Sequence, residues 1–346
     1  MPVFSHAEFD NHEQVVYCRD AAAGLSAIIA IHNTNLGPAL GGCRMLPYES
    51  EEAALDDVLR LSRGMTYKAA IADLALGGGK AVVLADSKRD KTEALLTAIG
   101  VAVERLGGRY ITAEDVGTTV ADMDVVRRAT RHVSGTTTEA GNPSPSTAHG
   151  VFIGMQAAAR HAFGSDDLTG RRVAIQGLGS VGLALCRYLK QAGARLVVTD
   201  ISPGAVERAV KEFGAESVEP EAIYEVEADI FAPCALGGII NDKTVKRLKA
   251  PIVAGSANNQ LDEPRHGEAL LKRGILYAPD YVINAGGLID VARPIMGMDI
   301  EAARVKLRKI YDTLLDIFRR SAEEQLPTSA VADRMAEARF RAAGRA

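Results

Sequence analysis

The sequence predicts an α/β protein of two domains, the second of which contains a doubly wound parallel sheet. The chain has 346 residues, and domains usually span ~100–200 residues. From Arg172 onward, short apolar runs alternate with helical segments, a pattern typical of parallel strands joined by helices. A glycine-rich turn over residues 177–182 separates the first of these runs from the helix that follows it.

The first part of the chain is predicted to mix strands and helices. Residues 25–31 form an apolar run that we interpret as a buried strand, leading into a loop over residues 32–42. Residues 53–70 carry apolar side chains at helical spacing. Lys68 therefore lies near the C-terminal end of a predicted helix.

Two further strands place charged residues at their ends. Residues 81–85 are predicted as a strand directly after a triple glycine, which puts Lys80 at a loop–strand junction. Glycine leaves the backbone free to adopt conformations closed to other residues, and it lets a ligand approach closely. Residues 110–113 are predicted as a strand that delivers Asp115 at its C-terminal end.

The second part begins after residues 140–147, a stretch rich in glycine, proline and serine that we interpret as a linker. The predicted strands that follow it cover residues 172–176, 195–199, 229–232, 252–254 and 275–277. Two closing helices are expected over residues 300–323 and 330–342.

Composition excludes several classes of function. The chain has 40 basic and 44 acidic residues, a formal charge of −4, so no strong field attracts nucleic acid or an anionic membrane. No apolar run is long enough for a membrane span, and the first ten residues do not resemble a secretory signal. The four cysteines are scattered without the spacing of a metal site. We expect a cytoplasmic protein without a metal.

The glycine-rich turn has the spacing of a dinucleotide site. Gly177, Gly179 and Gly182 follow a predicted strand and open a predicted helix, and Asp200 ends the next strand. The first glycine would make the tight turn, the second would admit the pyrophosphate, and the third would let helix and strand pack closely. A carboxylate at Asp200 would bond the ribose hydroxyls and repel a 2′-phosphate, which favours NAD over NADP. A purely structural turn is the less favoured interpretation.

Lys68, Lys80 and Asp115 are the candidate reactive residues of the first part. A lysine can bind a carboxylate as an ammonium ion, and it acts as a base when burial or a neighbouring cation lowers its pKa. Each residue alone is more often a solvated surface charge or a turn residue. The triple glycine and the apolar surroundings of Met65 favour a functional role without deciding it.

Long motifs resemble the leucine/valine/phenylalanine dehydrogenase branch of the glutamate dehydrogenase superfamily, over nearly the whole chain. In the first part these motifs cover residues 36–44, 63–68, 77–80 and 113–117. In the second part they cover residues 141–145, 232–237, 257–260 and 284–287. The resemblance implies a substrate-binding and oligomerisation domain, a Rossmann domain that binds NAD, and a cleft between them. Homo-oligomers are expected.

The resemblance also implies roles for individual residues. Lys80 would be the catalytic amine, Asp115 would exchange protons, and Lys68 would hold the substrate carboxylate. The other substrate-binding residues would be Leu40, Gly41, Met65, Ala113, Asn258, Asn284, Leu288 and Val291. The cofactor-binding residues would be Thr147, Gly177, Leu178, Gly179, Ser180, Val181, Gly182, Asp200, Ile201, Ala235, Leu236, Ser256, Ala257 and Asn258.

Leu40 indicates the substrate class. Glutamate dehydrogenases resemble this chain but carry a lysine here, which pairs with the γ-carboxylate. A carboxylate buried against leucine would be costly, so the recognised side chain should be apolar. Ala113 and Leu288 fill space that a phenyl ring would need. Since one methylene discriminates by only ~1–3 kcal/mol, leucine, isoleucine and valine are not ranked.

Three functions follow, in order of preference. The first is NAD-dependent oxidative deamination of an apolar L-amino acid to a 2-oxo acid and ammonia. The second is an aromatic L-amino-acid dehydrogenase with a roomier pocket, and the third is a catalytically silent NAD-binding sensor.

We expect residues 1–133 to form the substrate and oligomerisation domain and residues 134–329 the NAD domain. A C-terminal helix over about residues 330–346 would pack back on the first domain.

Overall fold

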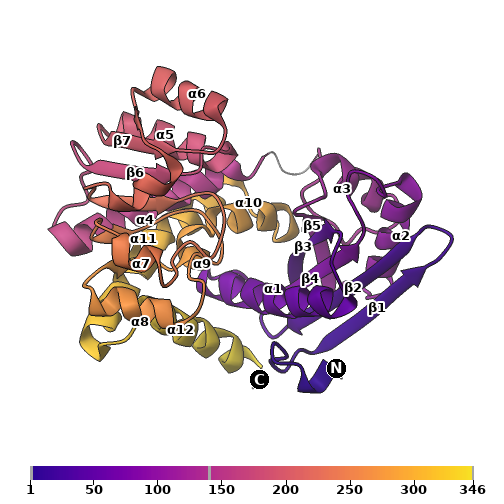
Figure 1. Ribbon diagram of the computed structural model, residues 1–346. Helices are drawn as coiled ribbons and strands as arrows, with labels where there is room; N and C mark the ends of the chain where they lie inside the picture. Colours follow the sequence, from indigo (N-terminus) through magenta and orange to yellow (C-terminus); the bar gives the residue numbers. More distant parts are fainter. Residues whose placement is uncertain (1–2, 139–141, 345–346) are drawn as a thin grey trace. The chain divides into compact units, whose positions relative to one another are not determined.

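The computed structural model describes residues 3–138 and 142–344, which form two compact units (Figure 1). Unit 1 comprises Met1–Gly141, Val291–Met298 and Ala336–Ala346, and unit 2 comprises Asn142–Asp290 and Asp299–Met335. The boundary therefore falls eight residues later than the sequence patterns suggest. Unit 1 also includes residues 291–298, which those patterns do not assign to it.

Unit 1 is built on a five-stranded mixed sheet with the order β1-β2-β4-β3-β5. Its strands are β1 (Gln14–Asp20), β2 (Leu25–Asn33), β3 (Ala39–Leu46), β4 (Gly77–Leu84) and β5 (Tyr110–Glu114). Strand β2 pairs antiparallel with both β1 and β4, whereas β3 is parallel to β4 and β5. A short 3₁₀ helix, η1 (Val3–Ser5), precedes the sheet.

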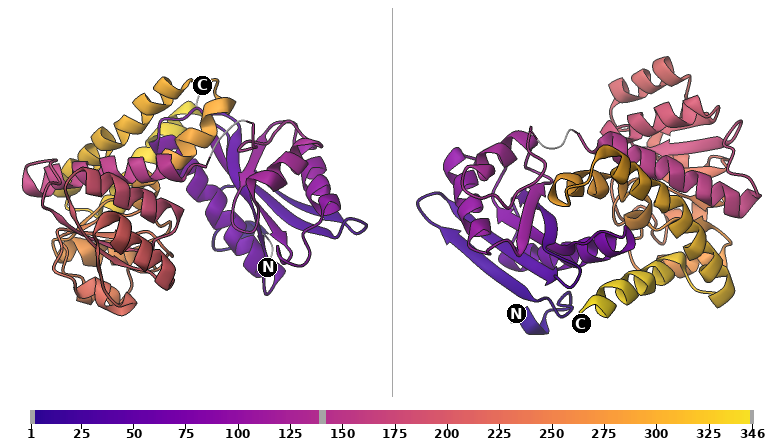
Figure 2. Two further views of the ribbon diagram at one scale, coloured as in Figure 1. Left: turned by 90° about the horizontal axis from the view of Figure 1, so that it is seen from above. Right: turned by 180° about the vertical axis from the view of Figure 1, so that it is seen from behind.

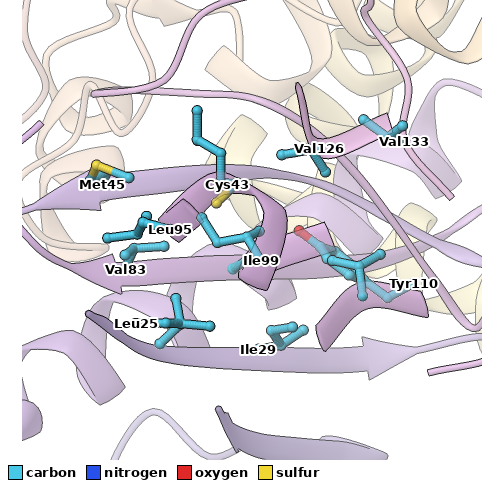
Figure 3. Packing of buried hydrophobic residues seen from close by; sticks show 14 of the residues in the cluster. Leu25, Ile29, Cys43, Met45, Val83, Leu95, Ile99, Tyr110, Val126 and Val133 are labelled. Carbon is cyan, nitrogen blue, oxygen red and sulfur yellow. The ribbon is translucent and has the colours of Figure 1, made fainter. Parts of the chain in front are cut away.

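Helices cover both faces of this sheet. Apolar residues of α1 (Glu51–Ile71) pack on one face, against Ile28, Ala30 and Val82. Residues of α2 (Glu93–Glu104) and α3 (Val120–Arg127) pack on the other. Figure 3 shows this second core, in which side chains from the strands meet those of α2 and α3. The division follows from the alternation of side chains along each strand.

Two predictions about the first sheet are wrong. Residues 39–42 are not part of a loop, because they begin strand β3. Lys80 does not lie at a loop–strand junction, because β4 begins at Gly77 and includes the triple glycine. None of the three glycines has a positive φ angle. They are required by close packing, since a Cβ on Gly78 would clash with the backbone nitrogen of Thr66 on α1.

Both ends of α1 are capped. The Ser50 side chain accepts a hydrogen bond from the Ala53 N–H at the N-terminus. At the C-terminus, the Arg339 guanidinium donates to the carbonyls of Ala70 and Ile71, at 2.9 and 2.8 Å. Arg339 belongs to α12 (Thr328–Ala343), whose last turns lie beside the end of α1 (Figure 2). The chain terminus thus satisfies carbonyls that a helix end leaves unpaired.

Unit 2 contains a six-stranded, fully parallel sheet with the order β11-β10-β9-β6-β7-β8. Its strands are β6 (Arg172–Gln176), β7 (Arg195–Thr199), β8 (Glu216–Ser217), β9 (Ile230–Pro233), β10 (Ile252–Val253) and β11 (Leu276–Tyr277). The strand order reverses between β6 and β9. Ligands of such sheets bind at this switch point, beyond the carboxyl ends of the strands.

The helices of unit 2 lie on both faces of its sheet. They are α4 (Ser144–Phe163), α5 (Ser180–Gln191), α6 (Pro203–Phe213), η2 (Pro220–Glu225), α7 (Thr244–Arg247), α8 (Arg265–Lys272), α9 (Asp280–Ile283) and α11 (Ile300–Glu324). Helix α10 (Gly286–Ile295) begins in unit 2 and ends in unit 1. Among residues 3–138 and 142–344, no helix has the length and apolar character needed to cross a membrane.

The linker predicted over residues 140–147 is only partly correct. Helix α4 starts at Ser144, so residues 144–147 are helical. Pro145 stands in the first turn, where its missing N–H costs no hydrogen bond. Ala140 and Gly141 lie outside the described residues.

Candidate active site

Leu40, Arg44 and Lys80 of unit 1 lie on the sheet face that α1 covers. Leu40 of β3 is the register partner of Gly78, and Arg44 is the partner of Val82. Val82 packs against α1, so Leu40 and Arg44 point to the same side. Lys80 lies between Gly78 and Val82 on β4 and shares this face. Pairing of parallel strands thus brings together residues that are far apart in the sequence.

Lys80 and Asp115 form a buried ion pair. Lys80 is only 5% exposed, and its Nζ lies 2.9 Å from Asp115 Oδ2. Burial alone would raise the pKa of Asp115, but the charges of Lys80 and Arg44 outweigh it and hold this pKa below its ordinary value. Asp115 is therefore an ionised carboxylate in direct contact with the predicted catalytic amine.

Arg44 is a second cation on the same carboxylate, and the sequence patterns do not single it out as a site residue. Its Nε lies 2.8 Å from Asp115 Oδ2, and its Nη1 lies 3.0 Å from Asp57 Oδ2 on α1. The sequence feature that could have identified Arg44 is the alternation of side chains between the two faces of β3. Once residues 39–46 are recognised as a strand, Leu40 and Arg44 share a face.

The backbone around Asp115 is tied to β3. The Asp115 N–H donates to Thr118 Oγ1 at 2.9 Å, and that hydroxyl lies 2.8 Å from the Cys43 carbonyl. One residue further along the chain, the Val116 carbonyl accepts from the Met45 N–H at 2.8 Å. The loop after β5 is thus anchored to β3 on both sides of the carboxylate.

Lys68 is half-buried in the last turn of α1. It follows Thr66 by two residues, and Thr66 packs against Gly78 of β4. Lys80 follows Gly78 by two residues on the strand. Both lysines therefore lie just beyond one helix–strand contact. Met65, also half-buried, is on the same helix.

Leu40, Gly41 and Ala113 are tightly packed on adjacent strands. Leu40 is 1% exposed and Ala113 is 6% exposed. Gly41 pairs with Thr112 of β5, and a Cβ on Gly41 would overlap the carbonyl of Gly79. This part of unit 1 is apolar and has little room for added atoms.

The glycine-rich turn of unit 2 has the features that a dinucleotide requires. Gly177 has a φ of 100°, and a Cβ there would clash with Ala235, which follows β9 across the switch point. Gly182 packs its Cα against the carbonyl of Gly177. At Gly179, a Cβ would meet no atom within 4 Å. Space is therefore open beside the N-terminus of α5, whose first two residues are Ser180 and Val181.

Asp200 binds the backbone of this turn. Its Oδ2 accepts from the Leu178 N–H at 2.6 Å, and its Oδ1 accepts from the Ser202 N–H at 2.8 Å. Two large apolar side chains at the same edge of the sheet are exposed, Ile201 at 93% and Leu236 at 77%. Exposed apolar side chains beside a polar loop are typical of a ligand-binding surface.

Asn284 and Asn258 are hydrogen-bonded to each other. Asn284 is 3% exposed, and its Nδ2 donates to Asn258 Oδ1 at 2.7 Å and to the Ser256 carbonyl at 3.0 Å. The buried Asn284 Oδ1 has no hydrogen-bond partner among the described residues. Ala257, which is buried, connects Ser256 and Asn258. A buried amide oxygen without a partner is available to a donor on a ligand.

The remaining predicted residues lie around the start of α10. Thr147, in the first turn of α4, donates to the Pro143 carbonyl at 3.1 Å and packs against Gly287. Leu288 is buried in unit 2. Val291 belongs to unit 1, where its carbonyl accepts from Ser134 Oγ at 3.0 Å.

The residues predicted to be catalytic or to bind substrate are therefore divided between the units. Unit 1 carries the two lysines, the carboxylate predicted to be catalytic and most of the apolar residues, namely Lys68, Lys80, Asp115, Leu40, Gly41, Met65, Ala113 and Val291. Unit 2 carries the two amides and one apolar side chain, Asn258, Asn284 and Leu288. The residues predicted to bind the cofactor are all in unit 2.

The residues of unit 2 fit the chemical groups of NAD. The open space at Gly179 lies where unpaired N–H groups of a helix start can bind phosphate. Asp200 supplies acceptors beside that turn. The unpartnered Asn284 oxygen can accept from an amide such as a nicotinamide carboxamide.

Comparison with known proteins matches both parts of the chain to one family. Residues 12–132 match the family model described as the Glu/Leu/Phe/Val dehydrogenase dimerisation domain. Residues 142–209 and 202–333 match the model of Glutamate/Leucine/Phenylalanine/Valine dehydrogenase.

Individual relatives match over nearly the whole length. The leucine dehydrogenase of Geobacillus stearothermophilus is 57% identical, over 98% of this chain and 94% of that protein. The valine dehydrogenase of Streptomyces virginiae is 50% identical, over 97% of this chain and 95% of that protein. The crystal structure of L-tryptophan dehydrogenase from Nostoc punctiforme superposes with a TM-score of 0.85 at 49% identity, covering 96% of this chain and 97% of that one.

Proposed function

This chain belongs to the Glu/Leu/Phe/Val dehydrogenase family of amino-acid dehydrogenases, and on that premise we propose that it uses NAD to deaminate branched aliphatic L-amino acids. The observation that carries the proposal is the buried pair of Lys80 and Asp115, in a chain 57% identical to a leucine dehydrogenase. The products would be a 2-oxo acid and ammonia, and the reaction would be reversible.

The proposed mechanism assigns the charged residues of unit 1 to the substrate. The Lys68 ammonium ion pairs with the α-carboxylate of the substrate, because the two groups carry opposite charges. Lys80 would first pass its proton to Asp115, and the amine so formed would take a proton from the water that attacks the imino carbon. Asp115 exchanges that proton with Lys80, with which it is already in contact at 2.9 Å. NAD bound by unit 2 would accept the hydride from the substrate Cα.

The choice of substrate side chain rests on Leu40. It is buried on β3 next to Gly41, on the same face of the sheet as Lys80. A γ-carboxylate beside this leucine would lose its hydration without gaining a partner, which costs far more than a misfit of one methylene. L-Glutamate should therefore not be a substrate.

An aromatic L-amino-acid dehydrogenase is the second candidate. The solved L-tryptophan dehydrogenase, at 49% identity, supports it. Against it stand the low exposure of Ala113 and the tight packing around Gly41, which leave little room for added atoms in that part of unit 1. Both candidates use the same charged residues, so only the size of the substrate side chain separates them.

Two further properties belong to the proposal. The match of residues 12–132 to a dimerisation domain supports a homo-oligomer assembled through unit 1. We also place the protein in the cytoplasm, where NAD and free amino acids are available.

The test is the initial rate of NADH formation across a panel of L-amino acids. We expect kcat/KM to be highest for leucine, valine and isoleucine, lower for phenylalanine and tryptophan, and undetectable for glutamate. The difference between branched and aromatic substrates should be at least about tenfold, which corresponds to ~1.4 kcal/mol of barrier. The reverse reaction with the matching 2-oxo acids, ammonium and NADH provides the control.

Each unexpected result has a separate meaning. Higher rates with aromatic substrates would contradict the interpretation of Ala113 and Leu288 and leave the family assignment intact. Turnover of glutamate would show that Leu40 does not line the pocket. No turnover of any amino acid would favour the third candidate function, a catalytically silent NAD-binding sensor.

A further inference from the structure

Arg44 lies at the centre of a charged network that connects α1 to the catalytic pair. It contacts Asp115 Oδ2 through Nε at 2.8 Å and Asp57 Oδ2 through Nη1 at 3.0 Å. Asp57 is held in turn by Tyr48, whose hydroxyl donates to Oδ2 at 2.7 Å, and by Arg60, whose Nη2 donates to Oδ1 at 2.9 Å. The side chains of Arg44 and Asp57 are only 20% and 13% exposed.

The network constrains the orientation of the Asp115 carboxylate. Lys80 Nζ and Arg44 Nε both contact Oδ2, from β4 and β3 respectively. Among the described residues, no donor side chain contacts the other oxygen, Oδ1. A carboxylate held by two cations at one oxygen has a fixed rotation, and its second oxygen remains available for proton exchange.

The Asp57 contact fixes Arg44 itself. Two separate nitrogens of the planar guanidinium bind two carboxylates, which sets both the position and the tilt of the group. A lysine has one nitrogen on a flexible stem and cannot reproduce this geometry. Arg44 is therefore placed by α1 and acts on Asp115 from β3.

We propose that Arg44 is a positioning residue for the reaction: braced by Asp57, it holds Asp115 Oδ2 beside Lys80 and leaves Oδ1 to exchange protons. The inference rests on the proposed function, because it assumes that Lys80 and Asp115 act in amino-acid deamination. It adds a residue that touches neither the substrate nor NAD in this role.

A pH profile distinguishes positioning from a merely structural role. Burial would raise the pKa of Asp115 and the charges of Lys80 and Arg44 lower it, so loss of Arg44 should raise it. The other titratable groups that face Asp115 have pKa values raised by burial, namely Cys43, Tyr48, Tyr110 and Glu114. Of these only Glu114 is a carboxyl group like Asp115.

The experiment compares kcat and kcat/KM of Arg44→Gln, Arg44→Lys and wild type between about pH 6 and about pH 9, with NAD and the best amino acid of the panel. Arg44→Gln should lower kcat at all pH values. Its kcat/KM should also fall at low pH along an acid limb whose midpoint lies at a higher pH than in wild type. Below that midpoint, each pH unit of the upward shift should cost about a further tenfold in kcat/KM. Arg44→Lys keeps the charge, so its acid limb should stay near that of wild type while kcat falls.

Two controls isolate the contact. Arg60→Gln removes a more exposed cation that binds Asp57 Oδ1 without reaching Arg44 or Asp115, so its kcat should fall less than that of Arg44→Gln and its pH profile should keep the wild-type shape. Glu114→Gln shows whether an acid limb belongs to this neighbour. NADH binding, which depends on unit 2, and the thermal midpoint confirm that each variant is folded.

The outcomes separate the inference from the function on which it rests. A loss in Arg44→Gln that is the same at every pH, or full wild-type kcat in Arg44→Lys, overturns the positioning role while deamination stands. If Arg44→Gln does not fold, Arg44→Lys alone decides, by whether kcat falls. Wild type without activity on any amino acid refutes the proposed function instead.

Discussion

At the level of a single residue, Asp200 has one task that its contacts show and a second task, at the ribose of NAD, that we propose. Its two oxygens accept hydrogen bonds from the Leu178 and Ser202 N–H groups and thereby hold the glycine-rich turn. An ionised carboxylate has about four acceptor sites, so two remain for ribose hydroxyls. Its charge would also repel a 2′-phosphate. The sequence pattern predicts the second task but not the first, which depends on the fold of the turn.

We expect wild type to prefer NAD over NADP and Asp200→Asn to weaken that preference. The amide removes the charge, so the ratio of kcat/KM for NADP to that for NAD should rise at least about tenfold. It also replaces one acceptor of the turn by a donor, so kcat/KM for NAD should fall. Steady-state kinetics with both cofactors measures these ratios.

Asp229→Asn is a matched control for this variant. Asp229 also accepts a backbone N–H, that of Arg172, but at the opposite end of β6. Its loss should leave the cofactor ratio unchanged. Equal use of NAD and NADP by wild type would show that Asp200 does not face the ribose.

At the level of elements, the triple glycine determines how α1 packs on β4. A Cβ on Gly78 would clash with Thr66 and with the carbonyl of Ser62. Gly78→Ala should push the helix from the strand, lowering the free energy of unfolding by about 1–3 kcal/mol. It should also lower kcat, since Lys68 and Lys80 both follow this contact. Denaturant unfolding and steady-state kinetics measure the two effects.

Gly64→Ala tests whether any glycine of the region would behave in this way. Gly64 is on the same helix, exposed, and a Cβ there meets no atom within 4 Å. Alanine should stabilise the helix by about 0.5–1 kcal/mol and leave kcat unchanged. A Gly78→Ala variant as stable and active as wild type would contradict the packing argument.

The same elements show how far the sequence predicts this fold. The bounds of β6 and β7 agree with the prediction, because apolar runs between turn signals are a strong local pattern. The starts of β3 and β4 differ from the prediction, since runs of glycine usually indicate turns. Lys80 and Asp115 are predicted to be catalytic by resemblance. Arg44 is not, because its contact depends on the pairing of β3 with β5, which no local pattern reveals.

At the level of the whole molecule, segments from three regions of the sequence meet around one buried histidine. His32 of β2 is 4% exposed, and its Nδ1 lies 2.8 Å from Thr66 Oγ1 on α1. The ring of His12, from the N-terminal segment, lies 4.8 Å away between centroids, and that of Phe340, near the C-terminus, lies 6.2 Å away. All of these residues belong to unit 1, where segments far apart in the sequence pack together.

Acid should therefore destabilise the protein through His32. Burial, and next the neighbouring His12, lower the pKa of His32 to about 4, whereas the ordinary value is 6.5. As the pH falls below 6.5, the unfolded chain binds a proton that the folded chain does not, so unfolding becomes more favourable until about pH 4. At ~1.4 kcal/mol per pKa unit, the loss is at most roughly 3.5 kcal/mol.

His32→Gln removes this proton while keeping a polar partner for Thr66. Denaturant unfolding of wild type and variant at about pH 8 and about pH 5 separates the two contributions. At the higher pH both side chains are neutral, so the difference in unfolding free energy reports packing alone. At the lower pH that difference should shrink or reverse, because only wild type carries the cost of a neutral buried histidine. Parallel pH dependence in the two proteins would show that His32 titrates equally in the folded and unfolded chains.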